Sequence, residues 1–389
     1  MPERVTGYVF AGRKNRKNRE GVGMDIKNGK MSGRQAGYMF FYSFLALPVL
    51  LLPQQLTRMS GMDGFFALVI GSLSGYLFLR IVLLLISHME CSYSELLQRY
   101  LGRGATCLVE LLYLLIALFT AAYGLQLLCQ VVRMYLIRDT PAWLVMGAVT
   151  ILILYGLGTD TECRGRRCEL LFWFVVVPLL LMILLAVWNI ESDHWLPVAQ
   201  ISGQQLLDSS YVVFSYMMVI ACLPIYADVT SQREQLCMHL KRSYLFSMIL
   251  QMILFLTLTG IYGVPTVAVM DDTLMELAAM VKVPGGFLER QDAWMCGIWF
   301  VGMYVFVETA WHAVTWSMEH IGGRQKRHWS LIGSGALVYP VALLLYRYRN
   351  WNLVLGHIYL AAAVPALVLI LTVLTVVVVW STRRKVEKK

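Results

Sequence analysis

The stretch that decides the fold is ALPVLLLP, residues 46–53, which places two prolines inside a long apolar run. A proline removes one backbone donor, and its ring collides with the carbonyl group four residues earlier. In lipid the freed carbonyl needs a partner, so such breaks persist where they face protein or a polar cavity. We therefore predict a membrane-spanning helix that is unwound or sharply kinked near Ala46–Pro48.

A second break is predicted in the run that opens with Asp208 and carries Pro224 after Phe214-Ser215-Tyr216. Transporters made of two inverted five-helix repeats begin each repeat with a broken helix and build the substrate site there. These two runs are the first and the sixth of the predicted spans, and so the first members of two five-span halves. We therefore expect that fold, with the second break near Ser215–Met218. Ordinary proline kinks are the alternative interpretation.

The fold class predicted is all-α and integral to the membrane. A membrane-spanning helix needs about twenty mostly apolar residues, and the sequence holds ten candidates. The predicted spans are 36–56, 64–87, 106–134, 142–158, 169–189, 209–227, 243–262, 290–316, 329–346 and 354–381, of which the fourth and ninth are short. Ser92 to Leu101 is predicted as an amphipathic helix on the inner face, and Asp271 to Lys282 as a short interfacial helix in an outer loop.

Positive charge sets the predicted orientation. Lys and Arg gather in alternate connections and in both tails, while residues 191–207 carry none. Cytoplasmic loops hold the excess of Lys and Arg in membrane proteins, so we place both termini in the cytoplasm. The predicted domains are a basic, disordered tail (1–33), a ten-span domain (34–382) and a second basic tail (383–389). Met24 and Met31 are alternative start sites to Met1.

Composition excludes several classes of protein. The chain is 58% hydrophobic and 15% charged, whereas soluble domains carry about 25% charged residues. We assign the net charge of +9 to orientation and to the anionic lipid bilayer, not to nucleic acid. The eight cysteines form no CxxC pair, so no metal site or disulfide framework is predicted. Catalytic motifs are lacking, so we expect no enzyme and no cofactor.

Two charged residues fall within predicted spans, where an unpaired charge is costly. Arg80 is long enough to reach the inner headgroups. Glu308 is too short for that, so we expect a buried ion pair or a proton-linked carboxylate there.

The ligand site is predicted near the bilayer midplane, bordered by the first, third, sixth and eighth spans. The candidate ligand-binding residues are Ala46, Leu47, Pro48, Tyr123, Gln126, Ser215, Tyr216, Trp299 and Met303. Hydrogen bonding between helices is the alternative role of the polar members.

Four stretches, in order, resemble the spore-germination permease family, the B-type subunit of nutrient germinant receptors. They are Met31-Ser32-Gly33-Arg34-Gln35, Ser94-Glu95-Leu96-Leu97-Gln98-Arg99-Tyr100-Leu101-Gly102, Trp195-Leu196-Pro197-Val198 and Gly286-Phe287-Leu288-Glu289-Arg290-Gln291-Asp292-Ala293-Trp294. The last is the most specific, and its Glu289, Arg290 and Asp292 are assigned a structural or gating role. The sequence departs from the family in lacking a Gly-Ser pair near Leu47-Pro48 and a Gly-Glu pair near Ser215-Tyr216.

The resemblance implies a member of the amino acid/polyamine/organocation transporter superfamily in the inner membrane of a bacterial spore. It implies a subunit that binds a small nutrient, mostly an amino acid, and triggers germination. It also implies two partners, an A-type membrane subunit and a C-type lipoprotein. A secondary amino-acid transporter and a membrane scaffold without ligand are the alternative functions.

Overall fold

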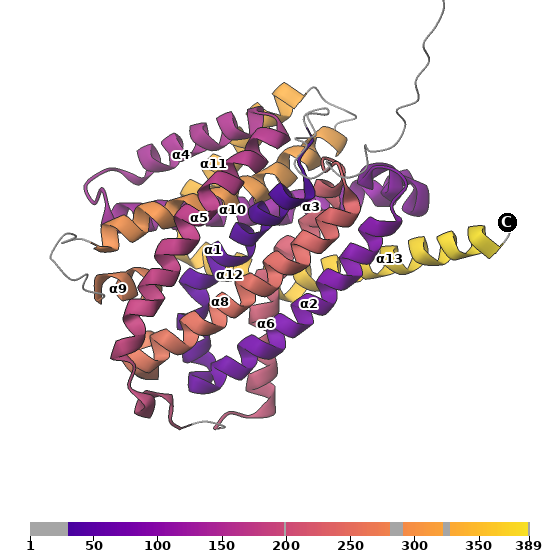
Figure 1. Cartoon of the computed structure of the whole chain (residues 1–389). Coiled ribbons are helices and arrows are strands. Elements are labelled where there is room, and N and C mark those ends of the chain that lie inside the picture. The colour runs from indigo at the N-terminus through magenta and orange to yellow at the C-terminus, as the bar shows by residue number, and fades with distance from the viewer. Residues whose placement is uncertain (1–29, 198–199, 281–290, 322–326, 388–389) are drawn as a thin grey trace, which may run out of the picture.

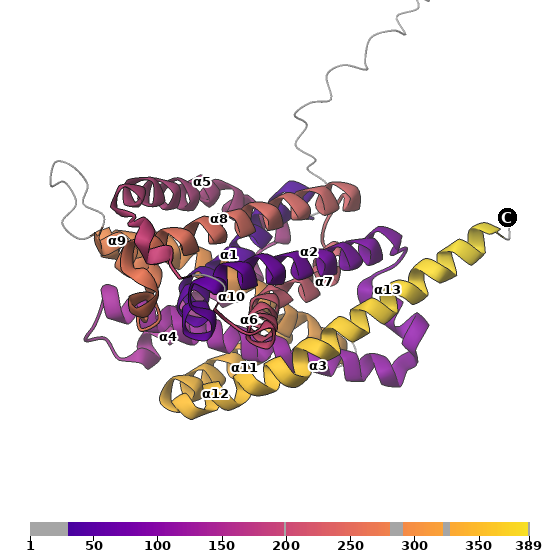
Figure 2. The same ribbon diagram turned by 90° about the horizontal axis from the view of Figure 1, so that it is seen from below.

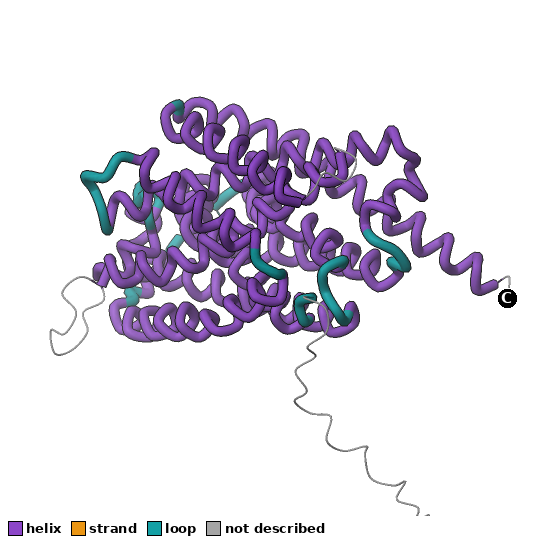
Figure 3. Tube along the Cα trace, turned by 90° about the horizontal axis from the view of Figure 1, so that it is seen from above, coloured by secondary structure: helices purple, strands orange, loops and turns teal. Residues whose placement is uncertain are grey.

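The structure is a computed structural model that describes residues 30–197, 200–280, 291–321 and 327–387. Within these residues the chain is helical and contains no β-strand, and one isolated β-bridge joins Met31 and Thr230. The helices run side by side as one bundle and are joined by short connections (Figures 1 and 3).

Ten membrane-crossing elements occupy the predicted spans. The first five are α1 (Gly33–Ser60), α2 (Gly64–His88), α3 (Tyr93–Tyr135), α4 (Ala142–Gly158) and α5 (Thr161–Ala186). The sixth is α6 (Gly203–Tyr216), continued by a 3₁₀ segment (Met217–Cys222) and α7 (Leu223–Ala227). The rest are α8 (Arg233–Val267), α10 (Gln291–Ile321), α11 (Arg327–Arg347), and α12 (Arg349–Ile358) joined by a π-turn (Tyr359–Ala363) to α13 (Val364–Glu387). Outside these lie α9 (Thr273–Met280) and 3₁₀ turns at Gly61–Asp63, Val187–Asn189 and Ser192–Trp195.

The described residues include 8 helical stretches long and apolar enough to cross a membrane. One of them, Gly33–His88, contains both α1 and α2, which meet at Gly61. That glycine has φ +56°, a left-handed conformation that other residues avoid. The short helix α4 has 17 residues and is equally apolar. The chain is therefore a multi-pass membrane protein.

The inverted repeat is visible in which helices touch. Corresponding members of the two halves contact each other: α1 with α6, α2 with α8, α3 with α10, and α4 with α11. A pseudo-two-fold axis in the membrane brings equivalent elements together in this way. In Figure 2, α1, α6 and α10 lie between a layer holding α5 and α8 and another holding α12 and α13.

The break predicted in the sixth span is present. Regular α-helix ends at Tyr216, and the next six residues, Met217–Cys222, form a 3₁₀ helix before α7 begins. Pro224 lies in the first turn of α7, where a missing N–H costs nothing.

The unwound segment predicted in the first span is absent. The helix α1 continues through both Pro48 and Pro53. Pro48 removes the donor for the carbonyl of Phe44, and the side-chain amide of Gln251 on α8 supplies one instead, at 2.8 Å. A neighbouring helix thus satisfies the freed group, so the backbone does not have to unwind.

The opening motif of the chain fastens the start of α1. Ser32 and Gln35 form a reciprocal capping box. Gly33 packs so closely on α8 that a β-carbon there would lie 2.5 Å from the backbone nitrogen of Leu236. Arg34 also pairs with Glu169 of α5 at 2.5 Å. The motif therefore joins the inner ends of three helices.

Two predicted short helices are present. Residues 93–101 form the inner helix and are set off from the rest of α3 by Gly102, at φ +80°. Ser92 and Glu95 cap its start. The outer-loop helix α9 is not only interfacial, because its Leu274, Met275 and Leu277 are fully buried against the bundle.

Candidate functional site

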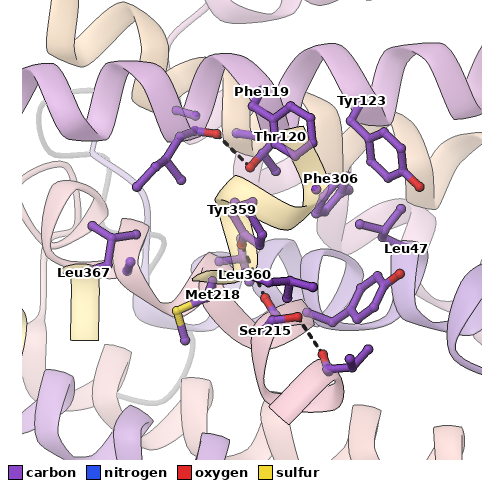
Figure 4. A pocket seen from close by; sticks show the side chains of 18 of the residues that line it. Leu47, Phe119, Thr120, Tyr123, Ser215, Met218, Phe306, Tyr359, Leu360 and Leu367 are labelled. Atoms are coloured by element: carbon purple, nitrogen blue, oxygen red, sulfur yellow. Dashed lines mark hydrogen bonds between the residues drawn. The ribbon is translucent and has the colours of Figure 1, made fainter. Parts of the chain in front are cut away.

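A cavity of about 390 Å³ lies beside the break in the sixth span. Five spans contribute to its wall: α1, α3, α6 with its 3₁₀ segment, α10, and the last span. In Figure 4, Phe119, Thr120 and Tyr123 of α3 face Ser215 and Met218 across the space, with Tyr359 between them. A cavity of this size is within the usual range for small-molecule sites.

The polar groups of the wall come mainly from aromatic and amide side chains. Tyr216 donates its hydroxyl to Gln55 of α1 at 3.0 Å. Tyr359 donates to the carbonyl of Ser215 at 3.3 Å, where the α-helix gives way to 3₁₀. Asn352 donates through its amide nitrogen to Leu345, and its buried amide oxygen has no hydrogen-bond donor. The wall thus holds one acceptor in need of a donor.

Four of the nine residues predicted for the ligand site line this cavity. They are Leu47, Tyr123, Ser215 and Tyr216. Their role in binding remains a prediction, but the structure brings them together from α1, α3 and α6.

The other five predicted residues lie outside the cavity wall. Ala46 packs near Gly302 of α10, and Pro48 lines a small gap beside Gln251. Gln126, Trp299 and Met303 lie nearer the outer end of α3 and α10 and are buried among neighbouring helices. On α10 the cavity is instead lined by Phe306 and Ala310, which lie one to two turns further along the helix.

The sequence prediction missed the last span as a wall of the site. Asn352, Gly356 and His357 of α12 line the cavity, as do Tyr359, Leu360 and Leu367. The predicted span began at residue 354, which left Asn352 in a loop. The sequence signal that could have indicated this was the amide of Asn352 and the imidazole of His357 at the start of a long apolar run. Polar side chains rarely face lipid, so these two are expected to face the interior of the protein.

Hydrogen bonds connect the cavity wall to the inner end of the protein. Tyr113 of α3 lines the cavity and donates to the carbonyl of Ala221 in the 3₁₀ segment at 2.9 Å. Its oxygen also lies 3.2 Å from that of Tyr93, on the inner helix 93–101. The backbone N–H of Tyr93 donates to Asp228, just after α7, at 2.9 Å.

Two carboxylates stand at this inner end. Glu110 of α3 is 3% exposed and accepts a hydrogen bond from the Ser94 hydroxyl at 3.1 Å. Burial raises the pKa of Asp228 to about 6, while the hydrogen bond from Tyr93 and the charge of Arg233 oppose that rise. The inner helix is therefore tied to both α3 and the end of the sixth span.

Glu308 forms the buried ion pair allowed by the sequence. Both of its oxygens accept from one nitrogen of Arg167 on α5, at 2.7 and 2.8 Å. Arg80 is exposed on α2, and its reach to the inner headgroups stays a prediction. Glu289 and Arg290 lie outside the described residues. Asp292 lies in the first turn of α10, and its side chain is likewise outside the described part.

A family model described as spore germination protein matches residues 30–350. The chain belongs to the spore germination protein family. The spore germination protein YndE of Bacillus subtilis (strain 168) is 19% identical over 357 residues, which cover 88% of this chain and 96% of YndE.

Solved transporter structures share the fold. A Na⁺-coupled sialic acid symporter in a substrate-bound outward-open state matches with a TM-score of 0.63 at 10% identity. The match covers 85% of this chain and 77% of the symporter. A manganese transporter of Eremococcus coleocola matches with a TM-score of 0.53 at 14% identity, over 89% of this chain and 77% of its own. At these identities the likeness is one of architecture.

Proposed function

We propose that this protein is the membrane subunit of a spore nutrient germinant receptor. It binds a small nutrient, an amino acid, in the cavity beside the broken sixth span and thereby triggers germination. An A-type membrane subunit and a C-type lipoprotein are its proposed partners. The observation that carries the proposal is a cavity of about 390 Å³ at the break of a spore-germination family member.

The chemistry of the wall fits a small, partly polar ligand. The wall combines apolar members, such as Leu47, Phe119 and Phe306, with Asn352, whose amide oxygen has no hydrogen-bond donor among the described residues. A ligand ammonium group is a suitable donor for that oxygen, and the apolar side of a small amino acid would face Phe306. Sites of this kind combine an apolar lining with a few placed polar groups that fix orientation.

The hydrogen-bonded path to the inner end supports signalling. Tyr113 touches both the cavity and the 3₁₀ carbonyl of Ala221, and it reaches Tyr93 on the inner helix. A ligand that shifts the 3₁₀ segment would change these contacts and so move the helix 93–101. That helix is then the surface through which a partner senses occupancy.

Secondary amino-acid transport is the second candidate function, supported by the likeness to the two transporters. Uptake and sensing use the same site but differ in outcome. Concentration of a labelled amino acid inside proteoliposomes that contain only this protein would favour transport.

Germination of spores that lack the gene tests the receptor proposal. A nutrient panel should reveal at least one amino acid whose response is lost and is restored by the wild-type gene. Normal responses to every nutrient would overturn the proposal. Tyr123→Phe and Tyr216→Phe should raise the nutrient concentration for half-maximal germination roughly tenfold, as expected for one lost hydrogen bond. Tyr155→Phe is the matched control, because that side chain is 74% exposed.

A further inference from the structure

The wall of the cavity beside the sixth span carries no carboxylate, ammonium or guanidinium group among the residues that the structure describes. Its imidazole belongs to His357, which is exposed on α12. The buried ion pair of Glu308 with Arg167 does not line this space, and its two members hold each other. A charged group on a ligand therefore finds no counter-charge in the described wall.

An amino acid brings two opposite backbone charges, and neutral groups of the wall suit both. The amide oxygen of Asn352 is an acceptor for the ammonium group. Tyr123 also lines the cavity, and its hydroxyl makes no hydrogen bond to a described residue, so it is free to donate to the carboxylate. A third charge, on the side chain, would be buried without a partner, which is strongly unfavourable. The wall therefore favours an amino acid whose side chain is uncharged.

Aromatic rings make up a large part of the same wall. Its six aromatic residues are Tyr113, Phe119, Tyr123, Tyr216, Phe306 and Tyr359. Three of them form a row: the ring of Phe119 stacks on that of Tyr123 with centroids 5.8 Å apart and lies 5.9 Å from that of Tyr359. Figure 4 shows this row beside the space, with Phe306 next to it. A further ring, supplied by a ligand, would extend the row.

Neighbouring groups hold these rings in place. Tyr359 is fixed by its hydrogen bond to the carbonyl of Ser215. Phe306 is 2% exposed and lies against α3 at Gly124, where a β-carbon would stand 3.0 Å from the ring. A surface that is already ordered loses little conformational freedom when a ligand binds, so its contacts contribute more fully to affinity.

The size of the cavity favours a large side chain over a methyl group. Its volume of about 390 Å³ lies in the lower part of the range of small-molecule sites. An aromatic side chain buries about 150–250 Å² of surface and gains further from ring contacts at suitable geometry. The methyl group of alanine would leave much of this space unfilled and would gain no ring contact.

We propose that the nutrient bound in this cavity is an amino acid with an uncharged aromatic side chain, such as phenylalanine. The row of Phe119, Tyr123 and Tyr359 selects its ring, and the absence of charge from the described wall excludes lysine, arginine, aspartate and glutamate. This inference rests on the proposed function, because it specifies the ligand of the same site.

Binding of labelled amino acids to the full-length protein in nanodiscs tests the inference. L-phenylalanine should bind at least roughly tenfold more tightly than L-alanine, because a ring buries far more apolar surface than a methyl group. L-lysine and L-glutamate should bind at least roughly a hundredfold more weakly than L-phenylalanine. Alanine or lysine binding as tightly as phenylalanine would overturn the inference and leave the proposed function standing. Binding of no amino acid at all would contradict both.

A variant of the row separates ring contact from simple burial. Phe119→Leu should weaken binding of L-phenylalanine roughly fivefold, the effect of one lost ring pair, and should leave binding of L-leucine within about twofold. Phe66→Leu is the matched control, because Phe66 on α2 is 46% exposed and outside the cavity wall. An equal loss for both ligands in Phe119→Leu would contradict the ring contact. If that variant does not fold, the selectivity of the wild type among the four amino acids decides alone.

Discussion

Asn352 lines the cavity, and its buried amide oxygen has no hydrogen-bond donor in the described part of the chain. Leaving a buried acceptor without a donor costs free energy, so binding of a ligand whose donor reaches this oxygen would be favoured. We expect Asn352→Leu to raise the nutrient concentration for half-maximal germination roughly tenfold, the effect of losing about 1.4 kcal/mol. Membrane abundance, measured by immunoblot, should not change. Asn350→Leu, at an exposed position, is the control, and an equal shift in both variants would contradict a ligand contact.

Asp228 predicts a pH dependence of stability. Burial raises its pKa in the folded protein from 3.8 to about 6. Between these values the folded state holds a proton that the unfolded state has lost, so stability falls as the pH rises through the window and levels off above it. Asp228→Asn keeps an acceptor for Tyr93 and removes the charge. Its unfolding free energy should therefore fall less than that of wild type between about pH 4 and 6.

Denaturant unfolding in detergent across this pH range measures the difference. Burial also raises the pKa of Asp272 to about 6, so the unfolding free energy of the Asp228→Asn variant should still fall somewhat with rising pH. In the double variant with Asp272→Asn, the unfolding free energy should depend on pH even less. Identical pH profiles for wild type and Asp228→Asn would show that Asp228 does not titrate in this window.

Single residues of the candidate site were predictable where they lie at or beside a helix break that the sequence predicts. Leu47, Ser215 and Tyr216 follow from the prolines and the repeat, and Tyr123 from the polar face of α3. Trp299 and Met303 were predicted by depth alone, and the cavity lies further along the same helix. Depth along α10 depends on packing and tilt, which the sequence of one helix does not encode.

At the scale of one helix, α1 stays helical through Pro48 because a neighbouring helix replaces the hydrogen bond that the proline removes. Pro48 leaves the Phe44 carbonyl without its helical donor, and Gln251 of α8 donates to it at 2.8 Å. We expect Gln251→Leu to lower the unfolding free energy by about 1–3 kcal/mol, the cost of an unsatisfied buried carbonyl. Chemical denaturation in detergent measures it.

The Pro48→Ala change gives this prediction an internal control. An alanine at position 48 restores the N–H that bonds the Phe44 carbonyl within the helix. Gln251→Leu should then lower the unfolding free energy clearly less in the Pro48→Ala background than in wild type, and a double-mutant cycle measures this difference. Additive effects would mean that Gln251 stabilises the protein by some other contact.

Elements were predictable where the signal was local. Capping boxes begin α1, α3 and α6. The break in the sixth span is predicted by the polar residues and the proline of its own sequence. The continuity of α1 and the contribution of α12 to the cavity wall could not be predicted, because each depends on a contact with a segment far away in the sequence. Tyr359, for example, reaches the carbonyl of Ser215, 144 residues away. Long-range partners of this kind carry no signature in either segment alone.

At the scale of the whole molecule, the alternation of basic connections predicts the direction of every span. The contacts between corresponding halves, such as α3 with α10, fit an inverted repeat, and an inverted repeat of five spans needs both termini on one side. The basic tails place that side in the cytoplasm. The outer 3₁₀ turn Ser192–Trp195 and the connection that contains Gln325 should then lie on opposite sides of the membrane.

Cysteine labelling tests this orientation in intact cells. Cys107 and Cys163, which are exposed, are first replaced by serine to lower the background. Ser192→Cys should react with a membrane-impermeant maleimide added outside, and Gln325→Cys should react only after the membrane is opened. The physical reason is that the basic residues Arg324 to Arg327 flank Gln325, and moving such a cluster across the membrane opposes both the membrane potential and its attraction to anionic lipid. External labelling of Gln325→Cys would reverse the orientation, and with it the assignment of the helix 93–101 to the inner face.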